Sequence, residues 1–353
     1  MMRRSLVALA LTAFVADVYG QSATKLPNIT ILATGGTIAG DATSSTQLGY
    51  ASGQVGVETL IKAVPALGKI AKITGEQISN VGSQDMSDAI WLKLAKRVNE
   101  LAKSQDVDGV VITHGTDTME ETAYFLHLVA KTQKPIVLTG SMRPSTSLSA
   151  DGPLNIYNAV AIAADPNAAG RGVLVAINDQ IHSAHDLTKM NTTSVETFMS
   201  PYRGLIGSSS YGANQFYREP FKRNTTESEF GVDAVTQLPR VDILYVYEDM
   251  PADLVNASVS AGARGIVMAG VGNGNMPKAV MDALSRAAQN RVVVVRASRV
   301  PTGFVGRNVE VNDDQLGFVA SEELNPPKAR VLLRLALLKT KDPKQIQKFF
   351  NDY

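Results

Sequence analysis

The sequence contains no cysteine in 353 residues. Disulfide bonds, thiol nucleophiles and metal sites built on cysteine are therefore excluded. Histidine is also scarce, with four in the chain. His182 and His185 have a spacing that could hold a metal on a helix, but no third imidazole accompanies them, so we expect ordinary polar residues and no metal site.

An excess of charge of either sign is missing too. The chain has 34 basic and 33 acidic side chains and no run of like charges. Such a balance does not favour binding to nucleic acid or to a membrane surface. No apolar stretch of the chain approaches the length that crosses a bilayer. The expected partner is a small, nearly neutral molecule.

The first residues form a distinct segment. Arg3 and Arg4 are followed by an apolar stretch from Leu6 to Val15 and by small residues as far as Gly20. This is the layout of a secretory signal peptide, and its apolar part is too short to span a membrane. We predict a signal peptide at residues 1–20 and a periplasmic or secreted protein.

Short apolar runs rich in β-branched residues alternate with helical patterns along the rest of the chain. One helical pattern, Asp88–Lys103, places its apolar residues on one face after a capping Ser87. Runs that are apolar throughout indicate strands buried on both faces, so the fold class is α/β, with a mostly parallel sheet covered by helices. The expected strands are Ile29–Ala33, Gly109–Thr113, Ile136–Thr139, Val173–Ile177, Val241–Tyr247, Gly265–Ala269 and Val292–Ala297.

The length favours two domains. The stretch 216–238 is polar and poor in strand signals, and we place a linker at 216–240. A larger N-terminal α/β domain then covers 21–215, and a smaller α/β domain covers 241–353.

Hydroxyl-bearing residues and glycines follow two of the expected strands. The first strand runs into ATGGTIAG, with Thr37, and the second runs into THGTDT, with Thr116 and Asp117. Ligands of α/β proteins gather at the carboxyl ends of strands, where free backbone N–H groups favour negative charge. Taken alone, each motif is also ordinary turn chemistry, and Thr118 with Glu121 fits a capping box. Because the two motifs share residue types and topological position, we favour a shared ligand.

These two segments resemble the signature segments of the bacterial-type L-asparaginases, specifically the exported type II enzymes with their asparaginase and glutaminase-asparaginase branches. The resemblance covers essentially the whole chain after the signal peptide. It is carried by ILATGGTIAG, VITHGTDTMEETAYFL, GSQDMSD, MRPSTSLSADGPLNIYNAV, AGVGNGN, SRVPTG and LNPPKARVLL.

The resemblance implies an amidohydrolase that converts L-asparagine, and L-glutamine more weakly, to L-aspartate and ammonia through a threonine nucleophile and an acyl-enzyme. Thr37 matches the nucleophile, and Tyr50 matches a tyrosine on a mobile lid at 40–53. Thr116, Asp117 and Lys189 match a second catalytic cluster, in which the lysine acts as a base or keeps a proton network poised. The residues alone do not decide which threonine attacks, and Lys189 alone resembles a solvated loop lysine.

Other positions match residues that bind the substrate. Ser83 and Gln84 match the site for its α-carboxylate, and Asp117 matches the partner of its α-ammonium group. Asn275 and Glu310 match residues that a neighbouring subunit contributes, which implies a homotetramer with shared active sites. Asn275 stands where glutamine-preferring members often have a smaller residue, which favours asparagine, although a dual-specificity enzyme remains the first alternative.

Two hypotheses of other classes remain open at this point. An exported two-domain α/β protein can be a periplasmic amino-acid-binding protein that alters nothing. A phosphate-binding α/β enzyme is less favoured, since no lysine follows the glycine turns. GVGNGN only approaches a dinucleotide fingerprint, so we expect no cofactor.

Overall fold

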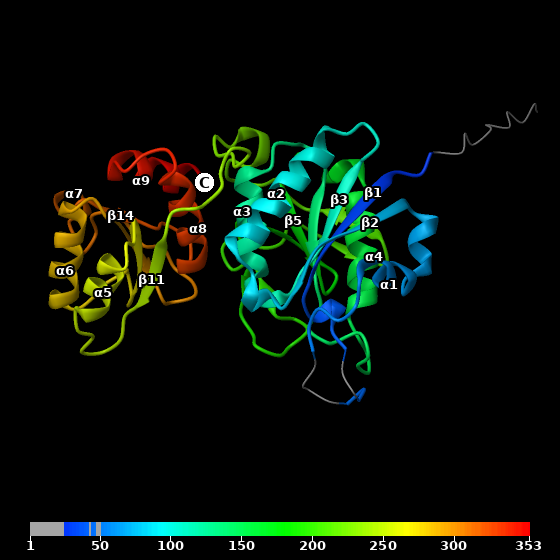
Figure 1. Cartoon of the computed structure of the whole chain (residues 1–353), viewed down its shortest axis with the longest axis horizontal. Helices are drawn as coiled ribbons and strands as arrows, with labels where there is room; N and C mark the ends of the chain where they lie inside the picture. Colours follow the sequence, from blue (N-terminus) through cyan, green and yellow to red (C-terminus); the bar gives the residue numbers. More distant parts are fainter. Residues whose placement is uncertain (1–24, 42–43, 47–50) are drawn as a thin grey trace, which may run out of the picture.

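The computed structural model describes residues 25–41, 44–46 and 51–353. The predicted signal peptide at 1–20 and the predicted lid residue Tyr50 lie outside the described residues. The described chain contains a large sheet in its N-terminal part and a smaller sheet in its C-terminal part, each with helices on both faces (Figure 1). None of the helices within these ranges is both long and apolar enough to cross a membrane.

The large sheet has eight strands in the order β10-β9-β6-β5-β4-β3-β1-β2. The strands from β2 to β5 along this order are parallel, and β6, β9 and β10 add to the sheet antiparallel. Their bounds are β1 Asn28–Gly35, β2 Lys72–Val81, β3 Gly109–Thr113, β4 Ile136–Thr139, β5 Val173–Ile177, β6 Gln180–Ser183, β9 Gly207–Ser210 and β10 Ala213–Phe216; a separate hairpin pairs β7 Thr188–Lys189 with β8 Phe198–Met199.

Alternation of side chains along the central strands divides the apolar residues between two faces of this sheet. Leu32 and Ile112 face one side with α2 Asp88–Lys103 and α3 Met119–Val129. Ile31 and Val111 face the other side with α1 Val57–Lys62 and α4 Gly152–Ala163. Because both faces are covered, the strands are apolar throughout, as the sequence predicts.

The smaller sheet is parallel, in the order β11-β12-β13-β14. Its strands are β11 Val241–Tyr245, β12 Gly265–Gly270, β13 Val293–Ser298 and β14 Phe318–Ala320. Its helices are α5 Asp253–Ser260, α6 Lys278–Gln289, α7 Asp313–Leu316, α8 Pro326–Ala336 and α9 Pro343–Asp352. Short 3₁₀ helices occur at η1 Thr37–Ala39, η2 Pro65–Lys69, η3 Ser83–Asp85, η4 Thr116–Thr118, η5 Pro166–Ala168 and η6 Thr225–Glu227.

Each predicted strand is present, with end points shifted by no more than two residues. The predicted helix has the expected bounds, and the Ser87 side chain caps it by accepting a hydrogen bond from the N–H of Ile90. The alternative interpretation of Thr118 and Glu121 as a capping box is wrong. Thr118 makes no side-chain cap to α3, because its hydroxyl donates to the carbonyl of Ser83 instead.

Helix α8 lies between the two sheets and packs on α3 (Figure 1). Polar contacts fasten this junction at several points. Arg334 of α8 pairs with Asp88, and the buried Lys328 donates to the carbonyl of His185 at 2.7 Å. The segment predicted as a linker also packs inward, since its Phe230 is buried against Phe349. The two parts of the chain therefore share a packed apolar core.

A buried ion pair organises the smaller sheet. The guanidinium of Arg296 on β13 donates to both carboxylate oxygens of Asp313, at 2.6 and 2.7 Å, and neither side chain is exposed. Arg296 also donates to the carbonyl oxygens of Asn273 and Gly306. One cation thereby joins the loops that follow β12 and β13.

We predict that Asp313→Ala lowers the free energy of unfolding by about 3–5 kcal/mol, since it leaves Arg296 charged and unpaired in the interior. Asp282→Ala is the matched control, because it breaks the solvent-exposed pair of Lys278 and Asp282 on α6. It should lower the free energy of unfolding by about 0.3–0.5 kcal/mol. Urea denaturation of both variants measures the difference, and equal losses would contradict the buried-pair account.

Candidate active site

The turn after β1 depends on two consecutive glycines. Gly35 and Gly36 have φ of +113° and +83°, a region that other residues rarely adopt. A Cβ on Gly35 would lie 2.4 Å from the carbonyl oxygen of Val81. The chain can therefore turn sharply against the end of β2, and this places Thr37 in a buried position at the start of η1.

The turn after β3 touches the turn after β1, because β1 and β3 are neighbouring parallel strands (Figure 1). The hydroxyl of Thr34 donates to the carbonyl of Thr113 at 2.9 Å. A Cβ on Gly36 would lie 2.3 Å from the backbone nitrogen of Gly115. No side chain fits between the two backbones, so Thr37 and Thr116 are held on adjoining turns.

A third turn, after β2, completes the group. Ser83 of η3 is buried, and its hydroxyl accepts a hydrogen bond at 3.1 Å from the backbone N–H of Asp117. Thr118 donates to the Ser83 carbonyl at 2.7 Å. Ser83 retains its own hydroxyl hydrogen to donate to a ligand.

Lys189 reaches the second turn from β7. Its ammonium group donates to the Thr116 hydroxyl at 2.9 Å and to the Asp117 carboxylate at 2.6 Å. The lysine side chain is 17% exposed, whereas that of Asp117 is 63% exposed. The cluster therefore has a shielded cation at its base and a carboxylate open to an incoming molecule.

A cavity of about 260 Å³ opens at the meeting point of the three turns. Four predicted site residues line it, namely Thr37, Ser83, Gln84 and Asp117, together with Gly36, Ser52, Gly82 and Gly115. In the sequence, Thr116 stands between the lining residues Gly115 and Asp117, and its hydroxyl accepts the hydrogen bond from Lys189. The volume suits a molecule the size of an amino acid.

Asn275 and Glu310 do not line this cavity. They belong to the C-terminal part of the chain, where the side-chain amide of Asn275 donates to the Glu310 carboxylate on the exposed surface. Within this chain, the structure therefore joins these two residues to each other and not to Thr37. Tyr50 lies outside the described residues.

His114, inside the second motif, has a structural environment. Its ring is fully buried, and Nδ1 is 2.7 Å from the carbonyl oxygen of Gly115. Burial lowers the pKa of His114 to about 4, so the ring is neutral at pH 7. His182 and His185 lie on and just after β6, not on a helix, where His182 contacts Ser200 and His185 contacts Asp186.

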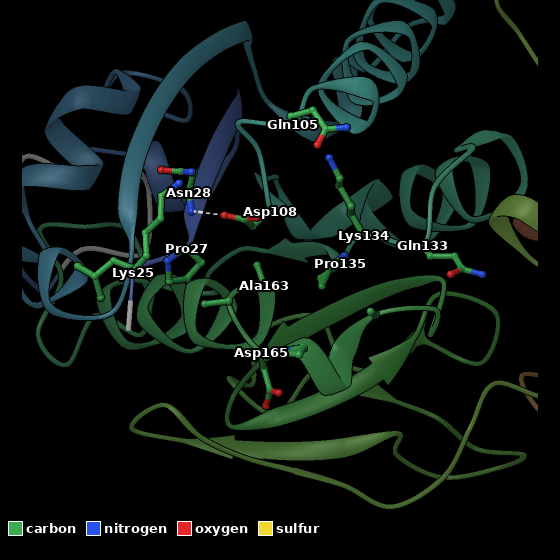
Figure 2. A pocket seen from close by; sticks show the side chains of 14 residues that line it. Lys25, Pro27, Asn28, Gln105, Asp108, Gln133, Lys134, Pro135, Ala163 and Asp165 are labelled. Carbon is green, nitrogen blue, oxygen red and sulfur yellow. Dashed lines mark hydrogen bonds between the residues drawn. The ribbon is translucent and has the colours of Figure 1, made fainter. Parts of the chain in front are cut away.

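A larger cavity, of about 550 Å³, lies at the opposite end of the strands, where β1, β3 and β4 begin (Figure 2). Polar groups in this cavity mainly form hydrogen bonds with backbone groups near the ends of strands and helices. Asp108 accepts from the N–H of Asn28 at 2.7 Å, and Lys134 donates to the carbonyl of Ser104. It contains no hydroxyl–lysine arrangement, and its position is remote from the carboxyl ends of the strands.

Sequence reasoning missed two residues that belong to the site. Ser52, inside the predicted lid segment 40–53, lines the cavity but was not predicted as a site residue. Glu120 accepts a hydrogen bond from the backbone N–H of Lys189 at 3.1 Å. Glu120 lies within the quoted motif, but no sequence signal relates it to a residue so distant in the chain.

Taken together, a small polar cavity at the carboxyl edge of an α/β sheet, lined by hydroxyls and a carboxylate, is the arrangement of an enzyme for a small polar substrate. Comparison with known families agrees. Residues 28–222 match the family described as Asparaginase, N-terminal, and residues 240–350 match the Glutaminase/Asparaginase C-terminal domain. The chain belongs to the asparaginase family.

Individual relatives cover nearly the whole chain. A probable periplasmic L-asparaginase of Haemophilus influenzae is 55% identical over 349 residues, 99% of each chain. An L-asparaginase 2 of Escherichia coli is 55% identical over 97% of this chain and 98% of its own. The crystal structure of a probable cytoplasmic L-asparaginase from Campylobacter jejuni superposes with a TM-score of 0.90 at 48% identity, covering 93% of this chain and 100% of the other.

We predict that Gly36→Ala is more destabilising than Gly170→Ala. Both glycines have positive φ, but a Cβ on Gly170 meets open space, whereas one on Gly36 meets the backbone of Gly115. Gly170→Ala should lower the free energy of unfolding by about 1–2 kcal/mol from backbone strain alone. Gly36→Ala should lose measurably more in urea denaturation, and an equal loss would show that the two turns are not in close contact.

Proposed function

We propose that this chain hydrolyses L-asparagine to L-aspartate and ammonia. The observation that carries the proposal is the convergence of Thr37 and the Lys189–Thr116–Asp117 cluster at one cavity of amino-acid size. Membership of the asparaginase family along the full chain supports the choice of substrate. An amide is chemically inert in water, so a nucleophile, a proton acceptor and oxyanion donors have to be placed together.

In the first proposed step, the Thr37 hydroxyl attacks the side-chain amide carbon of asparagine. The hydroxyl proton passes to the polar network and then to the leaving nitrogen, which departs as ammonia. The carbonyl oxygen becomes negatively charged in between, and the backbone N–H of Thr116 is the proposed donor that stabilises it. The product of this step is an ester between the Thr37 oxygen and the β-carbonyl of aspartate.

In the second step, water attacks the ester and releases L-aspartate, and the proton returns to Thr37. The Lys189–Thr116–Asp117 cluster is suited to accept the proton of the attacking water, since its hydrogen bonds connect a hydroxyl to an ammonium and a carboxylate. The same contacts also suit Thr116 as the attacking group. We favour Thr37 because it lines the cavity directly. We propose that Tyr50 closes over Thr37 as part of a lid.

The proposed binding groups surround the reacting centre. Ser83 and Gln84 would bind the substrate α-carboxylate, for which the Ser83 hydroxyl is a suitable donor. Asp117 would bind the α-ammonium group through its exposed carboxylate. These contacts fix both ends of the amino acid, so that the side-chain amide is presented to Thr37.

Glutamine is the expected weaker substrate. The extra methylene of glutamine moves its amide, and a single methylene changes discrimination by about 1–3 kcal/mol. Asn275, which stands where a smaller residue often accompanies glutamine preference, supports the asparagine preference. Equal efficiency on both substrates would favour the dual-specificity alternative.

We propose that Asn275 and Glu310 complete the cavity of a second copy in a homotetramer. The surface around them supports an interface, because several large apolar side chains on the same loops and strand ends are exposed. They are Tyr245, Tyr247, Val300, Phe304 and Val309. Exposed large apolar side chains at the carboxyl ends of the strands of one sheet favour a protein interface.

The expected location is the periplasm or the medium. The signal-like sequence at 1–20 and the periplasmic relative of Haemophilus influenzae support this location, whereas the Campylobacter jejuni relative is described as cytoplasmic. The division into 21–215, a linker at 216–240 and 241–353 likewise stays a proposal.

Thr37→Ala should abolish ammonia release from L-asparagine, by at least about a thousandfold in kcat, since the nucleophile is lost. Binding of L-aspartate, measured by calorimetry, should be retained because the binding groups remain. Thr132→Ala is the control, because Thr132 is also buried but lies outside the cavity. A wild-type protein that binds asparagine and releases no ammonia would instead be a binding protein.

A further inference from the structure

Lys189 is delivered by an element with little support of its own. Strand β7 consists of Thr188 and Lys189 alone, and it pairs with the equally short β8 outside the large sheet. Two-stranded pairs of this size are marginally stable in isolation. Something else must therefore fix the Lys189 backbone for its ammonium group to meet Thr116 and Asp117 at 2.9 and 2.6 Å.

Glu120 is placed to do this. It lies in the first turn of α3, three residues after Asp117, and is 9% exposed. Its Oε2 accepts from the backbone N–H of Lys189 at 3.1 Å. Helix α3 thus positions both partners of the lysine, since Thr116 and Asp117 lead into the same helix that carries Glu120.

The other carboxylate oxygen faces the C-terminal part of the chain. The side-chain amide of Asn325 donates to Oε1 of Glu120 at 3.3 Å and to the Thr188 hydroxyl at 3.4 Å. Asn325 is also the cap of α8, where its own oxygen accepts from the N–H of Lys328. One buried carboxylate therefore joins α3, β7 and α8.

The buried ammonium group of Lys328 stabilises the buried charge of Glu120. Lys328 is 3% exposed and contributes an attractive charge to Glu120. Burial raises the pKa of Glu120 and lowers that of Lys328, and each of the two charges opposes the shift of the other. Replacing buried ionic groups by apolar residues is often neutral or stabilising, so the presence of Glu120 and Lys328 in the interior fits a specific geometric requirement.

We infer that Glu120 is a positioning residue that holds Lys189 in register with Thr116 and Asp117, and that Asn325 couples this contact to the C-terminal domain. The inference rests on the proposed role of Lys189 in amide hydrolysis. Removing the acceptor releases β7 and should lower kcat about 10- to 100-fold, the effect of losing an outer residue that orients a reacting group. KM should change less than about threefold, because Glu120 does not line the cavity.

The test has to distinguish the loss of the hydrogen-bond acceptor from the loss of the negative charge opposite Lys328. Both variants are therefore made in a Lys328→Met background, which has no cation at this position. In that background, Glu120→Leu removes the acceptor, whereas Glu120→Gln keeps an oxygen at the same reach. Steady-state ammonia release should show a lower kcat in the leucine variant than in the Lys328→Met background. In the glutamine variant, kcat should lie within about threefold of that background. Equal kcat in both variants would overturn the inference.

Glu120→Asp in the otherwise unchanged chain is a second variant that keeps the charge opposite Lys328. It withdraws the carboxylate by one methylene and should lower kcat about tenfold. Glu121→Leu is the matched control, because Glu121 is the next residue of α3 and faces Arg330 instead of β7. A comparable fall in kcat in Glu121→Leu would overturn the positioning role, since the loss of any carboxylate from the first turn of α3 would then suffice.

Backbone hydrogen exchange provides a readout that does not depend on activity. The amide of Lys189 should exchange faster in the Glu120→Leu variant than in its background, and unchanged exchange would overturn the inference. The wild-type protein measured in the same ammonia assay separates the two proposals. If it releases no ammonia, the proposed function fails, and the exchange rates alone decide the role of Glu120.

Discussion

The close approach of two backbone turns is the constraint on which the site depends. Gly36 lies against Gly115 because β1 and β3 are adjacent parallel strands, and any side chain at Gly36 would collide with the neighbouring backbone. Hydroxyls that are far apart in the sequence are thereby brought to one cavity on adjoining turns. A site built on strand ends in this way is preorganised, which is what a reaction with a poor leaving group requires.

Support for this arrangement extends outward in layers. Ser83 fastens the turn after β2 to the backbone of Asp117, and Lys189 fastens Thr116 to Asp117. Glu120 in turn holds Lys189. Asn325 connects Glu120 to α8, which packs on the smaller sheet. The C-terminal part of the chain therefore supports the site of the N-terminal part, besides presenting Asn275 and Glu310 on its surface.

The central architecture could be predicted because burial on both faces leaves a strong signal in the sequence. The four central strands from β1 to β5 are continuous apolar runs, and each is present where expected. The two edge strands gave no such signal. β10 reads ANQF, and β2 is largely polar along its ten residues, because edge strands face solvent and need no apolar side chains. β9, which lies between β10 and β6, reads GSSS and gave no apolar signal either.

The site was predictable to the extent that its residues lie in the turns themselves. Thr37, Thr116 and Asp117 follow apolar strands among glycines, which is a pattern with a physical meaning. Lys189 had no such local signal and was assigned from family resemblance. Glu120 could not be found at all, since α3 is buried on nearly every side and its sequence does not show which carboxylate faces β7.

The most direct test of the central claim is a crystal structure of the protein with L-aspartate, the proposed product. The account predicts one aspartate in the cavity between the three turns, with its side-chain carboxylate in hydrogen-bonding range of the Thr37 and Thr116 hydroxyls and its α-carboxylate at Ser83. Aspartate bound elsewhere, or contacting only one of the two threonines, would contradict it.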